Sequence, residues 1–155
     1  MENLIESFYQ AFQKRDAESM IASYHNDIRF QDPAFGKLEG VKAKCMWKML
    51  CKNAKDLKIE YSDIKFDPEK NEGSAKWEAW YTFRKTGNKV HNKIQASFKF
   101  EDGLIIEHID DFSLKNWASQ AFGLTGKLFG GTSLFRKFLQ KQTNEMLLKY
   151  MKTDI

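Results

Sequence analysis

The sequence predicts an α+β fold: a cone-shaped, curved antiparallel sheet with three N-terminal helices on its concave face, followed by C-terminal helices. Three observations predict it. Apolar residues recur at helical spacing before residue 54, alternate at strand spacing from Leu57 to Phe112, and return to helical spacing after Leu114. Twisted and bulged strands curve a sheet, so helices laid on the concave side enclose an interior.

The N-terminal third predicts three helices and one strand. Apolar spacing indicates helices over residues 3–15, 17–24 and 41–53. Between the second and third helices, residues 28–32 alternate as a strand that ends before Pro33. Residues 36–40, which begin and end with glycine, are expected to form a turn.

The middle of the chain predicts a meander of long strands. Residues 57–66 begin with apolar side chains at odd positions and then switch to even ones, which is typical of a β-bulge. Residues 74–84 alternate most clearly, and a hairpin turn at 85–89 leads into the next strand, which continues to Phe100. The last strand is expected over residues 104–112.

The C-terminal part predicts a helix from about Leu114, then a glycine-rich loop over 123–131, and an amphipathic helix from Thr132 or Ser133. We therefore expect one domain over residues 1–122. Residues 123–155 are expected to pack on that domain or on a second subunit. The final helix is basic enough to touch a membrane, but its core-like spacing and Glu145 favour docking on protein.

Composition excludes several classes of protein. The formal charge is only +4, with lysines spread along the chain, so we expect no nucleic-acid partner. No apolar run approaches the length of a membrane span, and we expect no membrane partner. Cys45 and Cys51 lie too far apart on one helix to pair, and their spacing suits no zinc site. Free thiols and the lack of a signal-peptide pattern predict a cytoplasmic protein. We expect no metal and no cofactor.

Aromatic residues make up 14% of the chain, which fits either a ligand pocket or a core filled with rings. The sequence does not choose between these interpretations. The residues expected to line a pocket, if one exists, are Tyr9, Phe30, Trp47, Trp77, Tyr81, Asn92 and Phe112.

Asp32 is the first candidate catalytic residue. It shares strand parity with Ile28 and Phe30, so its carboxyl group can point into the core, where burial raises the pKa of a carboxyl and makes it a general base. The alternative is a strand-end aspartate that caps the turn before Pro33.

His108 and Asp110 are the other candidates. They share the even face of the last strand with Ile106 and Phe112, while the odd face carries Ile105 and Ile109. If the even face points inward, Asp110 can orient the His108 imidazole for acid–base chemistry. If the odd face points inward, both groups are solvated. Parity alone leaves both possibilities open.

Four segments resemble the nuclear transport factor 2-like superfamily in its SnoaL-like branch. They are 12–16 (FQKRD), 28–33 (IRFQDP), 35–40 (FGKLEG) and 107–112 (EHIDDF). The resemblance covers residues 1–122. It implies the cone fold described above and a homodimer through the outer face of the sheet, where Trp80 is the one large apolar residue.

The superfamily includes ketosteroid isomerases, dehydratases, polyketide cyclases, epoxide hydrolases and proteins that only bind ligands. The resemblance implies that Asp32 matches the strand-end base of the isomerases, and it favours the inward even face for His108 and Asp110. The oxyanion-stabilising pair of those isomerases falls on Phe8 and Ala96 here, which argues against ketosteroid isomerisation.

The sequence therefore predicts a small-molecule pocket protein for an apolar ligand. If it is an enzyme, we expect cofactor-free isomerisation, cyclisation or dehydration. Asp32 acts as base, His108 as the partner acid or base, and Asp110 orients His108. The alternatives are a non-catalytic ligand-binding protein and an interaction domain that works through its outer sheet or its C-terminal helix.

Overall fold

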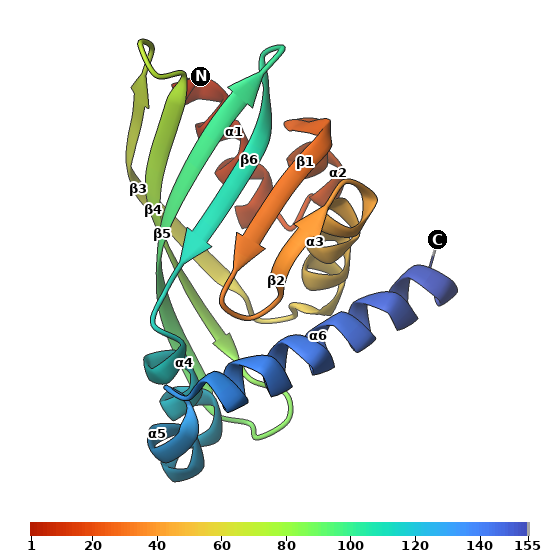
Figure 1. Ribbon diagram of the computed structural model, residues 1–155, viewed down its shortest axis with the longest axis vertical. Coiled ribbons are helices and arrows are strands. Elements are labelled where there is room, and N and C mark those ends of the chain that lie inside the picture. The colour runs from red at the N-terminus through yellow and green to blue at the C-terminus, as the bar shows by residue number, and fades with distance from the viewer. Residues whose placement is uncertain (155) are drawn as a thin grey trace.

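The computed structural model, which describes residues 1–154, consists of one six-stranded sheet with helices on one face and at one end (Figure 1). The strands are β1 Tyr24–Asp32, β2 Gly36–Glu39, β3 Lys58–Asp67, β4 Glu72–Thr82, β5 Lys89–Glu101 and β6 Leu104–Asp111. The helices are α1 Glu2–Gln13, α2 Ala17–Ala22, α3 Val41–Asn53, α4 Leu114–Phe122, α5 Leu124–Phe129 and α6 Ser133–Thr153. The predicted α+β class is confirmed.

The strand order is β2-β1-β6-β5-β4-β3, and all neighbouring pairs are antiparallel except β1 and β6. The sheet is thus antiparallel, as predicted, apart from this one parallel pair. Its long connection contains α3 and the meander of strands β3 to β5, which supplies the crossover that parallel strands need. The edge strands are β2 and β3, and the two segments richest in candidate site residues, β1 and β6, lie side by side within the sheet.

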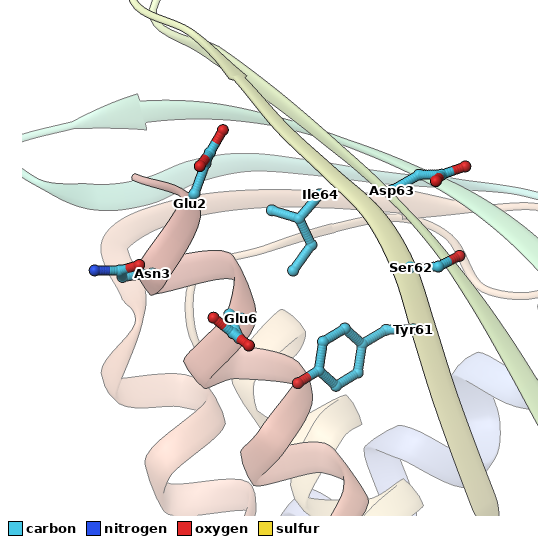
Figure 2. Close-up of a pocket in the computed structure, with 7 residues that line it drawn as sticks. All are labelled: Glu2, Asn3, Glu6, Tyr61, Ser62, Asp63 and Ile64. Carbon is cyan, nitrogen blue, oxygen red and sulfur yellow. The ribbon is translucent and has the colours of Figure 1, made fainter.

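The bulge predicted in β3 is present. The pairing of β3 with β4 shifts between Ser62 and Lys65, and Asp63 there has a φ of 53°. Figure 2 shows the consequence: Tyr61 and Ile64, three residues apart, both point toward α1. The bulge keeps the apolar side chains of a bent strand on the helix-covered face.

Two N-terminal boundaries differ from the prediction. Helix α2 ends at Ala22, and β1 begins at Tyr24 rather than at residue 28, because Tyr24 pairs with Ile105 of β6. Residues 36–39 form strand β2 instead of a simple turn, since Phe30 and Leu38 pair across a hairpin. In both cases pairing with a distant or neighbouring strand overrides the local pattern.

The stretch expected to be a glycine-rich loop contains α5. A Cβ added at Gly126 would lie 1.8 Å from the carbonyl oxygen of Ala118 in α4, and one at Gly130 would lie 2.5 Å from the Ala118 Cβ. These two glycines permit close packing of α5 on α4. The predicted start of α6 is right: the Thr132 hydroxyl caps it by accepting the Phe135 N–H at 3.2 Å.

Apolar side chains form two clusters. The main cluster fills the space between the concave face and α1–α3, and the second joins Val90, Leu114, Trp117 and Leu139 where α4 and α6 meet the sheet. Cys45 and Cys51 are both buried as free thiols. Among residues 1–154, the helices are too short or too polar to cross a bilayer.

Candidate functional site

A chain of hydrogen bonds runs through the interior between α3 and the sheet. Trp47 Nε1 donates to the Tyr24 hydroxyl at 2.8 Å, and that hydroxyl lies 2.6 Å from His108 Nδ1. On the other side, His108 Nε2 lies 3.0 Å from Oδ1 of Asp110, which also accepts the Trp77 Nε1–H at 3.1 Å. The even face of β6 therefore points inward, as the resemblance implies.

One arrangement of protons gives every group in this chain a hydrogen-bond partner. A tryptophan N–H only donates, so the Tyr24 oxygen accepts from Trp47 and its own proton goes to His108 Nδ1. The ring proton of His108 then sits on Nε2 and is donated to Asp110. One neutral tautomer satisfies every group, which is the requirement for a polar chain inside a core.

Aromatic rings enclose His108 completely. Its ring stacks on Trp47 at a centroid distance of 6.0 Å and lies 4.5 Å from the Phe98 ring. Phe8 and Phe30 approach it edge-on at 5.5 and 5.3 Å, and none of its surface is exposed. The imidazole thus has both nitrogens hydrogen-bonded and every face covered.

Asp32 lies at the end of β1, outside that aromatic enclosure. Its Oδ1 accepts the N–H groups of Ala34 and Phe35 at 2.9 and 2.6 Å, so the side chain caps the turn. The residue is half-buried, and burial raises the pKa of its carboxyl to about 7. The Phe35 N–H opposes that rise and the charge of Asp110 adds to it. Asp32 therefore combines features of both sequence interpretations.

Tyr81 and Trp117 border the same end of the interior. Trp117 Nε1 donates to the Tyr81 hydroxyl at 2.7 Å. Burial raises the pKa of Tyr81, and the charge of Asp32 raises it further, so the two groups influence each other electrostatically. Asn92, on β5, and Phe112, just after β6, are also half-buried.

Tyr9 carries the one buried side-chain polar atom without a hydrogen-bond partner among residues 1–154. Its ring packs parallel to Tyr61 at 5.5 Å and edge-on to Phe98 at 6.4 Å. Burial and then the charge of Asp110 hold the pKa of Tyr9 well above its usual value. A neutral hydroxyl donor is therefore held close enough to Asp110 to sense its charge.

Helix α6 fixes the turn that follows Asp32. Gln140 donates to the Pro33 carbonyl at 3.2 Å, Thr143 to Ala34 at 2.9 Å and Asn144 to Phe35 at 2.8 Å. Figure 1 shows α6 extending from the α4–α5 end past the β1–β2 hairpin toward α3. Three polar side chains on one helix thus hold three successive carbonyls beside the candidate base.

The structure divides the predicted site residues into two groups. The enclosed group, with no more than 3% of any residue exposed, is Tyr9, Phe30, Trp47, His108 and Asp110. The half-buried group is Asp32, Trp77, Tyr81, Asn92 and Phe112. Sequence reasoning missed Tyr24, which it placed at the end of a helix, and the α6 residues that hold the turn. Tyr24 shares strand parity with Ile28, which is the signal that could have found it.

Two surface hollows lie outside the enclosed group, and the lining of one of them includes Tyr81 of the half-buried group. One, of about 280 Å³, is bordered by Glu6 of α1 and by Tyr61 and Ile64 of β3 (Figure 2). The other, of about 350 Å³, lies beside Trp80 and His91 on the sheet. Neither has Asp32, His108 or Asp110 in its lining.

Trp80 projects from β4 and is half-buried within this chain. The His91 ring stacks on it at 4.3 Å with an interplanar angle of 15°, and Lys58 Nζ lies 5.0 Å from the ring centroid. These neighbours cover part of the indole. The homodimer expected through this face stays a prediction.

The curved sheet with helices on its concave face defines a cone-shaped α+β protein. Two carboxyl groups and an imidazole lie on the inner side of this sheet. The chain belongs to the SnoaL-like domain family, whose model matches residues 5–108. That match covers most of the sheet and the three N-terminal helices. A search of curated proteins gives no significant match.

Solved structures support the same fold. A candidate polyketide cyclase from Xanthomonas campestris superposes with a TM-score of 0.64 at 19% identity over 77% of this chain and 94% of its own. An epoxide hydrolase from M. tuberculosis gives 0.60 at 17% identity over 86% and 92%. A Catenulispora acidiphila protein with a ketosteroid isomerase-like fold, in complex with trimethylamine, gives 0.66 at 9% identity over 77% and 92%. At these identities the likeness establishes the fold.

Proposed function

We propose that the protein binds a small apolar ligand, as a pocket protein of the SnoaL-like type. It catalyses a proton transfer on this ligand without a cofactor, as an isomerase, cyclase or dehydratase does. The observation that carries this proposal is the position of Asp32. Its carboxyl group has a pKa of about 7, stands at the border of an aromatic interior, and uses only Oδ1 in the hydrogen bonds of its turn. A base with a pKa near the working pH is the efficient one.

The enclosed residues take supporting roles in this proposal. Asp110 is held by His108 and Trp77, and its charge raises the proton affinity of Asp32. His108 acts as a positioning residue, because both its nitrogens are engaged within the protein. This differs from the direct acid–base role that the sequence suggests for it. Tyr9 offers an O–H donor to a ligand oxygen, since that hydroxyl has no partner among residues 1–154.

Helix α6 regulates access in this proposal. The three side-chain hydrogen bonds that hold residues 33–35 are between neutral groups. Each contributes a net stabilisation of about 0.5–1.5 kcal/mol. Separating the turn from the helix therefore costs less free energy than unfolding the domain. A ligand reaches Asp32 and the rings behind it when this contact opens.

A second candidate, non-catalytic ligand binding, is favoured by the packing around His108. Because the imidazole is saturated by hydrogen bonds and covered by rings, it is not available as the second acid–base group of a catalytic pair. A binding protein would use the same half-buried residues and the Tyr9 hydroxyl to hold a ligand without converting it. The two candidates differ in whether Asp32 exchanges a proton with the ligand.

The test measures whether the protein catalyses proton exchange on a ligand. The purified chain is incubated in D₂O with a panel of cyclic apolar ketones, and mass spectrometry measures deuterium incorporation at the carbon next to the carbonyl. We expect catalysed incorporation for at least one compound, and a loss of about 10²–10⁴-fold in its rate for Asp32→Asn. The variant keeps the acceptor oxygen of its turn, so it should fold.

Asp111→Asn is the matched control, because Asp111 is exposed at the end of the neighbouring strand. It should leave the exchange rate unchanged. If a ketone binds but no deuterium is incorporated, or if Asp32→Asn exchanges as fast as the native chain, the acid–base role is wrong. Binding without exchange would establish the non-catalytic candidate instead.

A further inference from the structure

Large apolar side chains are exposed on one short stretch of the chain. Nine large hydrophobic residues are exposed among residues 1–154, and five of them lie within residues 124–138. Their exposed fractions range from 54% to 77%. We call them the α5–α6 patch: Leu124, Leu128, Phe129, Leu134 and Phe138. Single exposed hydrophobics are ordinary, but such a concentration marks an interaction surface.

Helix packing explains why these side chains face outward. Helix α5 presents its glycines to Ala118 of α4, so Leu124 and Leu128, one turn apart, point away from α4. In α6, Leu139 is buried, whereas Leu134 and Phe138 lie on the outer side. Figure 1 shows α5 and the start of α6 together at one end of the molecule, beyond the sheet.

The charge along this stretch of the chain is of one sign. Residues 112–144 contain five basic and no acidic residues, while the remaining 20 basic and 21 acidic residues almost balance. The local excess therefore exceeds the net charge of +4 of the whole chain. All five basic side chains belong to exposed residues: Lys115, Lys127, Arg136, Lys137 and Lys141.

The exposed apolar side chains and the positive charge together distinguish between the partners that could bind this surface. A second copy placed on the same patch by two-fold symmetry would bring one positively charged stretch against another, which is repulsive. A nucleic acid would pair with the charges but offers no apolar layer to Leu128 or Phe138. An anionic lipid surface provides both, because acyl chains accept apolar side chains while headgroups attract lysine and arginine.

We propose that the α5–α6 patch is a peripheral docking surface for membranes containing anionic phospholipids. The inner face of α6 packs on its own domain, as the sequence leads one to expect. The outer face and α5 remain available, and the proposal departs from the expectation that the chain has no membrane partner. This surface is separate from Asp32, so the proposal does not depend on the function proposed above.

The test is co-sedimentation of the full chain with vesicles. One set is phosphatidylcholine alone and the other is phosphatidylcholine mixed with phosphatidylglycerol. We expect binding to the mixed vesicles only, and weaker binding as salt rises, because salt screens the attraction between lysines and headgroups.

Two pairs of substitutions test the residues. Leu128→Ser with Phe138→Ser should weaken binding by about tenfold or more per side chain. Lys137→Gln with Lys141→Gln should weaken it by about fivefold per charge. Val41→Ser is the control for the first pair, because Val41 is 64% exposed on α3. Lys65→Gln with Lys93→Gln, on exposed strand positions, is the control for the second. Neither control should change binding.

Three results would overturn the proposal. The native chain could fail to sediment with anionic vesicles, or the control variants could lose as much binding as the patch variants. Alternatively, sedimentation velocity could show that the apolar pair breaks up an oligomer while vesicle binding is absent, which would assign the patch to a second copy. Because all substituted side chains are exposed, circular dichroism should report an unchanged fold in every variant.

Discussion

The Tyr24 hydroxyl lies 2.6 Å from Nδ1 of His108, and this contact joins the first strand of the sheet to the last. Neither residue has more than 3% of its surface exposed. In the arrangement that satisfies every group, the Tyr24 hydroxyl donates to Nδ1 and the ring N–H at Nε2 is donated to Asp110. A hydroxyl at the start of β1 is thus linked through His108 to a carboxyl group on β6.

Tyr24→Phe should destabilise the fold by about 1–3 kcal/mol, because it leaves Nδ1 of His108 and the N–H of Trp47 buried without partners. Urea unfolding followed by circular dichroism measures the change. Tyr61→Phe is the control, since the Tyr61 ring is only half-buried. If both variants unfold at the same urea concentration as the native chain, the Tyr24 hydroxyl does not stabilise the fold.

Asp32 should make the protein less stable as the pH rises from about 4 to 7. Over that interval the native carboxyl, with a pKa of about 7, holds a proton that the unfolded chain has already released. The free energy of unfolding therefore falls by roughly 2–4 kcal/mol and then stays level above pH 7, as far as this group is concerned.

Asp32→Asn removes this dependence, because an amide stays neutral. Urea unfolding should find the variant more stable than the native chain at pH 8 and equally stable at pH 4. Asp111→Asn, at an exposed position, should show no such difference. A variant less stable than the native chain at pH 8 would mean that Asp32 is there to stabilise its turn.

Releasing α6 from the turn should expose residues 33–35 to solvent. Asn144→Ala removes the donor to the Phe35 carbonyl, and we expect faster hydrogen exchange at the backbone amides of this turn. Glu145→Ala, at an exposed position of the same helix, is the control. Unchanged exchange in Asn144→Ala would show that α6 does not restrain the turn.

The expected homodimer makes Trp80 a test residue. If the outer face of the sheet is the interface, Trp80→Ser should shift the protein toward the monomer in sedimentation equilibrium, because aromatic residues contribute most to interfaces. Phe138→Ser, at the α5–α6 patch, should leave the association unchanged. A native chain that is monomeric at all concentrations would contradict the interface.

The strands were predictable from sequence wherever one face is buried and the other solvated. In β4 the alternation of Ala75, Trp77 and Ala79 with charged residues defines the face, and in β3 the change of parity defines the bulge. The boundaries that failed depend on distant partners. The start of β1 at Tyr24 requires β6, and α5 exists because Gly126 meets Ala118.

The candidate site was predictable only residue by residue. Parity and resemblance placed Asp32, His108 and Asp110 on inner faces, but the partners that determine their chemistry come from elsewhere in the chain. Tyr24 lies 84 residues before His108, and Asn144 lies 109 residues after Phe35. No local pattern encodes such contacts, so the hydrogen-bond partners of His108 could be found only from the structure.

The most direct test of the account is an NMR titration of the Asp32 carboxyl carbon, assigned by comparison with Asp32→Asn. We predict that this carbon titrates near pH 7, because burial and the charge of Asp110 favour the protonated form. That result would establish a carboxyl group able to accept and return a proton at neutral pH. A titration near pH 4, the ordinary range for aspartate, would contradict the account and leave Asp32 as the cap of a turn.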